Sequence, residues 1–117
     1  MKRVEKPWGY ELIWAHTDRY VGKLLHIEPG HSLSRQYHVQ KDETILVIEG
    51  ELVLEIGPSD AAERRVLGRH DTYRVVPGTI HRFIAEKSVD LMEVSTPELD
   101  DVVRLEDRYG RQGTSEA

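Results

Sequence analysis

The sequence contains no cysteine, and this absence excludes two kinds of site at once. Disulfide scaffolds and thiolate chemistry both require cysteine side chains. A metal ion bound by this chain must therefore be held by histidine, carboxylate or amide ligands. The 117 residues leave room for one domain with a modest core.

Long apolar runs are also absent. No segment approaches the ~18 apolar residues of a membrane span, and the N-terminal sequence MKRVEKPWGY lacks the apolar region of a signal peptide. We therefore expect a cytoplasmic protein that does not engage a membrane. An excess of positive charge is missing too, since the formal net charge is -5 and the pI about 5.7. Without a basic field to attract phosphate backbones, nucleic-acid binding is not expected.

No segment keeps a helical periodicity over the ~12 residues that an independent helix needs, and strand signals dominate instead. The segment 51–56 (ELVLEI) places Leu52, Leu54 and Ile56 on one face, as in a half-buried strand. Segment 59–66 (SDAAERRV) is expected to be a hairpin loop or one helical turn. Six or more short strands separated by turns indicate a sandwich, jelly roll or barrel. The predicted strands are 23–28, 44–49, 51–56, 72–76, 81–85 and 90–95.

Metal-binding side chains concentrate in two places. Gln36 and His38 lie two residues apart on an extended segment, so they point to the same face with Cα atoms ~7 Å apart. Glu43 follows a polar turn and opens the next strand, which can fold back beside the first. His81 begins another strand after a tight Pro-Gly turn. Two imidazoles, one carboxylate and one amide oxygen would hold a divalent ion and leave positions open for water or substrate.

This arrangement resembles the cupin superfamily. The spacing Gly30-x5-Gln36-x-His38-x4-Glu43-x6-Gly50 is similar to the first cupin motif, with Gln in place of its first His. The resemblance implies an all-β, single-domain cupin, a double-stranded β-helix or jelly-roll barrel. The barrel would span residues 1–111, including the N-terminal PWG segment and a C-terminal strap, and residues 112–117 would form a flexible tail.

The second cupin motif is matched at Gly78 and His81. It departs at three positions, because His70 stands where Gly is usual, Val76 where Pro is usual and Ala85 where Asn is usual.

The Gln variant is the pattern of phosphomannose isomerases. Segments 7–9 (PWG), 33–38 (LSRQYH) and 101–111 (DVVRLEDRYGR) are similar to parts of the isomerase domain of bifunctional mannose-1-phosphate guanylyltransferase/mannose-6-phosphate isomerases. The resemblance implies a sugar or sugar-phosphate isomerase that interconverts aldose and ketose. Zinc is the first expectation for its one divalent ion per chain, with manganese, nickel, cobalt and iron as alternatives.

The proton-transferring group is not fixed by the sequence. Among the available side chains, His26 and Arg104 are the catalytic candidates. A phosphate-bearing substrate would also need a cationic clamp. Lys23, Arg35 and Arg82 are the candidates for it.

Two other functions stay open. His38, Glu43 and His81 without Gln36 would form the two-histidine, one-carboxylate triad of a non-haem iron oxygenase. A carbohydrate-binding cupin without turnover is the third hypothesis, because so short a chain supplies little structure to enclose a substrate. Zinc, manganese, nickel or cobalt in the purified protein favours the isomerase, and oxygen-sensitive iron favours the oxygenase. A homodimer is expected, since a small barrel leaves sheet edges that must be paired or covered.

Overall fold

A computed structural model describes residues 1–114, which form thirteen strands in two antiparallel sheets. The first sheet contains, in spatial order, β1 (Lys2–Lys6), β2 (Gly9–His16), β3 (Val21–Ile27), β11 (Val89–Ser95), β6 (Glu43–Glu49) and β9 (Thr72–Val75). The second contains β13 (Gly113–Thr114), β12 (Val103–Glu106), β5 (Arg35–Tyr37), β10 (His81–Ala85), β7 (Leu52–Ile56) and β8 (Glu63–Leu67), with β4 (His31–Ser32) also paired to β10.

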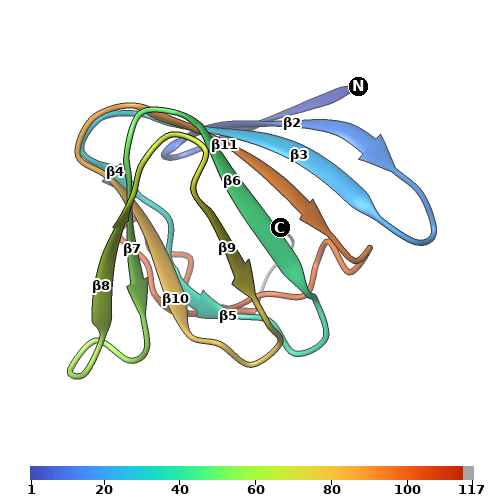
Figure 1. Cartoon of the computed structure of the whole chain (residues 1–117). Helices are drawn as coiled ribbons and strands as arrows, with labels where there is room; N and C mark the ends of the chain where they lie inside the picture. The colour runs from blue at the N-terminus through green and yellow to red at the C-terminus, as the bar shows by residue number, and fades with distance from the viewer. Residues whose placement is uncertain (115–117) are drawn as a thin grey trace.

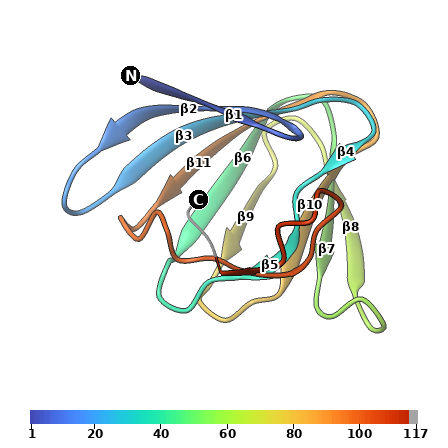
Figure 2. The ribbon, with the colours of Figure 1, turned by 180° about the vertical axis from the view of Figure 1, so that it is seen from behind.

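The two sheets face each other, and β2 and β3 extend past their neighbours at one end (Figure 1). The C-terminal segment returns across the molecule to lie beside β5, as the view from behind shows (Figure 2). This arrangement confirms the predicted all-β, single-domain fold class. No helix within residues 1–114 is long and apolar enough to cross a membrane.

The core lies between the inner faces of the sheets. In β6, Ile45 and Val47 are fully buried while the residues between them are only partly covered, which is the alternation that a half-buried strand requires. Leu54 of β7 and Phe83 of β10 face them from the other sheet. Burying side chains of this size contributes about 1.5 to 3 kcal/mol each, so this interior is what holds the two sheets together.

The predicted strands are present with shifts of one or two residues at their ends. Segment 59–66 is the exception, because its second half belongs to strand β8 rather than to a loop or a helical turn. β8 is an edge strand of the second sheet, and only Leu67 in it is buried. Its first four residues are exposed on both faces, so the alternation of burial that marks the other strands is missing. Strands β1 and β2 were not predicted either.

The N-terminal hairpin is fixed against the barrel by the PWG segment. Trp8 is buried in the core, and its carbonyl accepts a hydrogen bond from the backbone N–H of Glu28 at 2.9 Å. Gly9 has a φ of +151°, and a Cβ there would lie 1.9 Å from the carbonyl oxygen of His26. Only glycine fits this position. The consequence is that β2 lies directly against β3 and lines the inside of the barrel.

The C-terminal segment is the second attachment. β12 pairs with β5, and Gly113 and Thr114 pair with β12. Part of the predicted tail 112–117 is thus incorporated into the sheet, and residues 115–117 lie outside the described part of the chain.

Candidate metal centre

Three buried side chains from both sheets meet at one end of the barrel. His38 directly follows β5, His81 is the first residue of β10, and Glu43 is the first residue of β6. β5 and β10 belong to the second sheet and β6 to the first. The exposed fractions of the three residues are 3%, 1% and 3%. The three side chains therefore come together from both sheets at a place that is shielded from solvent.

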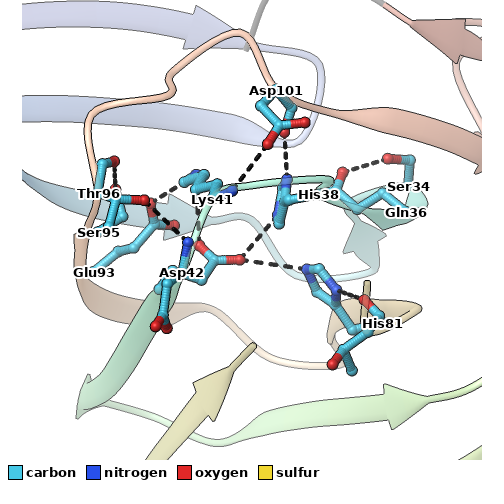
Figure 3. A network of polar contacts seen from close by, with 12 residues as sticks. Ser34, Gln36, His38, Lys41, Asp42, His81, Glu93, Ser95, Thr96 and Asp101 are labelled. Atoms are coloured by element: carbon cyan, nitrogen blue, oxygen red, sulfur yellow. Dashed lines mark hydrogen bonds and ion pairs between the residues drawn. The ribbon is translucent and has the colours of Figure 1, made fainter. Parts of the chain in front are cut away.

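The geometry of the three side chains suits a single ion. Glu43 Oε1 lies 3.1 Å from His38 Nε2 and 3.4 Å from His81 Nε2. The ligand atoms of all three residues lie within 4.8 Å of one another. Two atoms bonded to one ion at 2.0–2.2 Å are roughly 3 to 4.4 Å apart. Figure 3 shows the His38 and His81 rings directed at the same carboxylate oxygen.

The protonation of both imidazoles is set by backbone carbonyls. His38 Nδ1 donates to the carbonyl oxygen of Asp101 at 2.6 Å, and His81 Nδ1 donates to that of Thr79 at 2.8 Å. In the neutral ring the Nε2 lone pair is then free, as metal ligation requires. His81 Nε2 makes no hydrogen bond within the described residues. The two Nε2 lone pairs face the negatively charged Glu43 carboxylate. This arrangement is repulsive unless a cation lies between the three groups, so the residues present fit a divalent ion.

The loop between β5 and β6 is held from the far end of the chain. The Asp101 carboxylate accepts hydrogen bonds from the backbone N–H groups of Val39, Gln40 and Lys41 at 2.9, 2.6 and 2.9 Å. The Gly78 N–H donates to the His38 carbonyl at 2.7 Å. His38 is thereby coupled to the turn that precedes His81.

A buried ion-pair network lies behind Glu43. Lys41 Nζ is 3.1 Å from Glu93 Oε2 and 3.6 Å from Glu43 Oε2, and all three side chains are buried (Figure 3). Burial works against ionisation of Glu43, but the neighbouring charge of Lys41 holds its pKa well below the usual range. Burial and the charge of Glu43 raise the pKa of Glu93. Glu43 is therefore the carboxylate that is ready to bind a cation.

Gln36 lies beside this triad. It is the Cα partner of His81 in the β5–β10 ladder, and such directly opposed residues have neighbouring side chains. Its Oε1 accepts a hydrogen bond from Ser34 Oγ at 2.6 Å. The amide oxygen keeps a second lone pair, and Gln36 lines the same inner cavity as His38 and Glu43.

His38 and Glu43 of the triad line an inner cavity of about 50 Å³. A water molecule needs about 10–15 Å³, so the cavity has room for an ion and a few waters. Its lining comes from both sheets, the N-terminal hairpin and the C-terminal segment. The polar lining residues outside the triad are Lys6, Glu11, Lys23, Ser34, Gln36, Lys41, Glu93, Arg104 and Arg111.

The structure divides the remaining predicted site residues into two groups. Lys23 and Arg104 line the inner cavity, whereas His26, Arg35 and Arg82 do not. Each of these three side chains points to the opposite face of its strand from a residue of the site. Arg35 is next to Gln36, Arg82 is next to His81, and His26 is three residues from Lys23. Adjacent residues of a strand point to opposite faces.

The three displaced residues have other partners. Arg35 is paired with Glu55 and Glu106 at 2.6 Å each, and Arg82 Nε donates to the carbonyl of Leu33 at 3.0 Å. The ring of His26 lies 2.5 Å from the Asp90 carboxylate on the outer face of the first sheet. None of these locations supports the catalytic or substrate-binding role that the sequence suggested.

Several cavity residues escaped the sequence analysis. Lys6, Glu11 and Arg111 reach the cavity from segments remote in the chain, so spacing gives no signal for them. Glu93 could have been identified from the sequence, because it shares the inner face of β11 with Leu91. A carboxylate on the apolar face of a predicted strand marks either a functional group or an ion pair.

One wall of the cavity is cationic, formed by Lys6, Lys23, Arg104 and Arg111. Burial lowers the pKa of Lys6, and the neighbouring Lys23, Arg104 and Arg111 lower it further against the opposing effect of Glu11. Burial followed by the charge of Arg111 also lowers the pKa of Arg104. Two of the four cations have carboxylate partners, because Lys23 is paired with Glu11 and Arg111 with Asp107.

Sequence relatives include the mannose-1-phosphate guanylyltransferase ManC of Salmonella typhimurium, which is 36% identical over 116 residues. The match covers 94% of this chain and 23% of that protein, so the chain spans about a quarter of the length of such relatives. It confirms the resemblance drawn from the motifs.

Solved structures with the same fold include KdgF from a Halomonas species, with a TM-score of 0.72, 19% identity and coverage of 84% of this chain and 89% of that one. A sugar phosphate isomerase of the cupin superfamily from Silicibacter pomeroyi has a TM-score of 0.68 and 21% identity, over 81% and 64% of the two chains. Residues 23–96, more than half of the sequence, match the Cupin domain family. The chain therefore belongs to the cupin family.

Proposed function

We propose that this cupin is a metal-dependent isomerase that interconverts the aldose and ketose forms of a sugar phosphate. One observation carries the proposal: His38 and Glu43 of the converging triad line the same inner cavity as four cationic side chains. The first feature suits the reacting oxygens of a sugar, and the second suits a phosphate.

In this proposal His38, Glu43 and His81 hold the ion, and Gln36 supplies a fourth ligand. Zinc is the first candidate, and manganese, nickel, cobalt and iron are the alternatives, because the ligand set alone does not select among them. A bound divalent ion supplies Lewis acidity, which polarises the carbonyl and hydroxyl oxygens of the substrate. The chain's own part is to fix the two rings through Asp101 and Thr79, so that the ligand geometry is preorganised.

The substrate would occupy more than the inner cavity. An outer groove of about 440 Å³ adjoins it and is lined by residues of β1 and β2 together with Leu99 and Asp100. Glu11, Lys23 and Leu99 line both spaces. In this proposal the reacting carbons of the sugar phosphate lie at the metal ligands, and the rest of the substrate is directed past the cationic wall toward the outer groove.

The relatives support this substrate class. ManC, by its name, acts on mannose 1-phosphate, and one of the similar folds is named a sugar phosphate isomerase. Both names concern phosphorylated sugars.

The test is an NMR assay of mannose 6-phosphate and fructose 6-phosphate with protein stripped of metal and reloaded with each divalent ion. Interconversion by a reloaded form, absent from the stripped form, is the expected result. The free sugars serve as a control for the cationic wall and should react far more slowly. If no metal form converts either phosphate, the proposal is wrong.

A second candidate function has one observation in its favour. The Gln36 amide oxygen is already bonded to Ser34, which leaves His38, Glu43 and His81 as the two-histidine, one-carboxylate set of a non-haem iron oxygenase. Oxygen consumption by the iron-loaded protein with a sugar substrate, together with failure of the isomerase assay, would favour it.

Two expectations about the setting of the protein remain proposals. We propose that it acts in the cytoplasm and as a homodimer. The second sheet ends in strands β8 and β13, and the first in β1 and β9. Such edges carry unpaired backbone groups that a second copy can cover.

A further inference from the structure

Glu11 and Lys23 form a buried ion pair on the inside of the first sheet. Lys23 Nζ lies 3.4 and 3.5 Å from the two carboxylate oxygens of Glu11. The side chains are only 3% exposed for Lys23 and 8% exposed for Glu11. They come from neighbouring strands β2 and β3, where inward-facing positions are otherwise filled by residues such as Leu25 and Ile27.

The pair lies where two spaces meet. Glu11 and Lys23 line the inner cavity that His38 and Glu43 also line, and they line the outer groove as well. A molecule that reached from the groove to the metal ligands would contact both side chains. Neither residue is within hydrogen-bond contact of His38, Glu43 or His81 in the described part of the chain.

Stability does not explain why the pair is there. A buried ion pair is often no better for folding than two apolar side chains of similar volume, because both charges must leave water. Distances of 3.4 and 3.5 Å are also longer than a tight charge-assisted bond. Such a pair is held close but remains open to a third partner.

Glu11 is also distinguished from the other carboxylates of the inner cavity. Glu43 is a proposed metal ligand, and Glu93 lies behind it in contact with Lys41. Among the described lining residues this leaves Glu11 as the carboxylate that faces the space for substrate. His26, which the sequence offered as a proton-transfer group, lies on the outer face of the sheet.

We propose that Glu11 is the base and Lys23 the acid of the isomerisation, an inference that rests on the proposed function. The Glu11 carboxylate removes the proton from C2 of the aldose. The electron pair of that C–H bond forms the C1–C2 double bond, and the carbonyl π pair moves to O1, which takes a proton from the Lys23 ammonium group. The product of this half is a neutral enediol, with Glu11 protonated and Lys23 a neutral amine.

The second half restores both groups. The Lys23 amine takes the proton of the C2 hydroxyl, and the O2 electron pair re-forms a carbonyl at C2. The electron pair of the double bond then takes the proton from the Glu11 carboxylic acid at C1, which gives the ketose. Glu11 ends as a carboxylate and Lys23 as an ammonium ion, so no other reactant is needed.

The test compares Glu11→Gln with the parent protein, both loaded with the same metal, on mannose 6-phosphate in D₂O. NMR follows turnover and the entry of deuterium at C2 of recovered aldose and C1 of ketose. We expect Glu11→Gln to lose at least about a hundredfold in turnover, the usual scale of a general base, and to stop deuterium entry. Its metal content and Tm should stay close to those of the parent. Glu86→Gln, which removes an exposed carboxylate from the turn between β10 and β11, is the matched control and should change neither readout.

Two results would overturn the inference. Parental deuterium entry and turnover in Glu11→Gln would show that another group moves the proton, while leaving the isomerase activity established. If metal content and Tm both fall as far as turnover does, the pair has a structural role. Glu11→Asp guards against a folding defect, because it keeps the charge but draws the carboxylate back. We expect it to fold and to lose roughly tenfold or more, and full activity would also refute the role. A parent protein inactive with every metal refutes the proposed function and this inference together.

Discussion

Asp101 fixes the orientation of His38 in the candidate metal centre, although 62 residues of chain separate them: its carbonyl oxygen accepts a hydrogen bond from His38 Nδ1 at 2.6 Å. The carboxylate of the same residue accepts three backbone N–H groups of the loop that carries His38 to Glu43. One residue of the C-terminal segment thus sets both the ring and the loop of the metal centre.

Asp101→Asn should loosen this loop. An amide presents one acceptor oxygen where the carboxylate presents two, so we expect a loss of about 1 to 2 kcal/mol in the free energy of unfolding and weaker metal binding. Denaturant unfolding and metal titration measure the two effects. Asp100→Asn, at the exposed neighbouring carboxylate, is the control. Equal behaviour of the two variants would mean that the carboxylate does not organise the loop.

The same contact predicts how the stability of the protein changes with pH. Partial burial acts against ionisation of Asp101, but the N–H groups of Val39, Gln40 and Lys41 lower its pKa below the usual range. A depressed folded-state pKa contributes stability that is present above the unfolded pKa and is lost as pH falls through the folded pKa. The stability difference between the parent and Asp101→Asn should therefore shrink as the solution is acidified. A constant difference down to strongly acidic pH would contradict this reading.

Lys41→Met should destabilise the metal-free protein far more than the loaded one. Without Lys41, Glu43 and Glu93 are left as two buried carboxylates with no cation between them. Removing one partner of a buried ion pair costs about 3 to 5 kcal/mol, and a bound divalent ion offsets part of that cost. Thermal unfolding with and without metal measures the difference. Lys87→Met, at an exposed lysine, is the control; an identical Tm loss in both metal states argues against an ion beside Glu43.

Gln36→His should keep the metal but slow the reaction. A neutral amide oxygen is a weaker donor than imidazole and leaves the ion a stronger Lewis acid. We expect turnover to fall about tenfold, which corresponds to ~1.4 kcal/mol in the barrier, while Gln36→Ala weakens metal binding as well. Metal content and kcat on mannose 6-phosphate are measured together. Gln40→His, on the exposed part of the loop, is the control, and parental activity of Gln36→His would remove any electronic role for the amide.

The homodimer can be tested by light scattering. The outer face of the first sheet exposes Trp14 and Val94, with exposed fractions of 48% and 52%, and both sheets end in unpaired edges. We expect the mass of two chains at micromolar concentration, because a second copy would cover apolar surface and edges at once. A monomer mass under these conditions counts against the proposal.

The candidate metal centre could be predicted from the sequence because it depends on the spacing of residues within short segments. Gln36 and His38 are held to one face by the two-residue period of a strand, and Glu43 and His81 each begin a strand after a turn. The same period could have excluded Arg35 and Arg82, since each is adjacent to a predicted metal ligand, Gln36 or His81. It also shows that His26 and Lys23 cannot both face inward.

The rest of the site depends on contacts between distant segments. Glu11 faces Lys23 because β2 pairs with β3, and Arg111 reaches the cavity because β12 crosses to β5. Strand β8 was missed for a different reason: an edge strand exposed on both faces has no alternation to detect. Propensity and spacing do not report such arrangements.

The most direct test of the metal centre is the metal content of the purified protein after removal of metal and equilibrium dialysis against zinc, measured for the parent and for the His38→Ala/His81→Ala double variant. A His16→Ala/His70→Ala variant loses the same number of histidines from exposed positions and serves as the control. The structure predicts about one tightly bound ion per chain in the parent and the control, and none in the His38→Ala/His81→Ala variant. Undiminished binding by that variant would contradict the assignment of these side chains as the metal ligands.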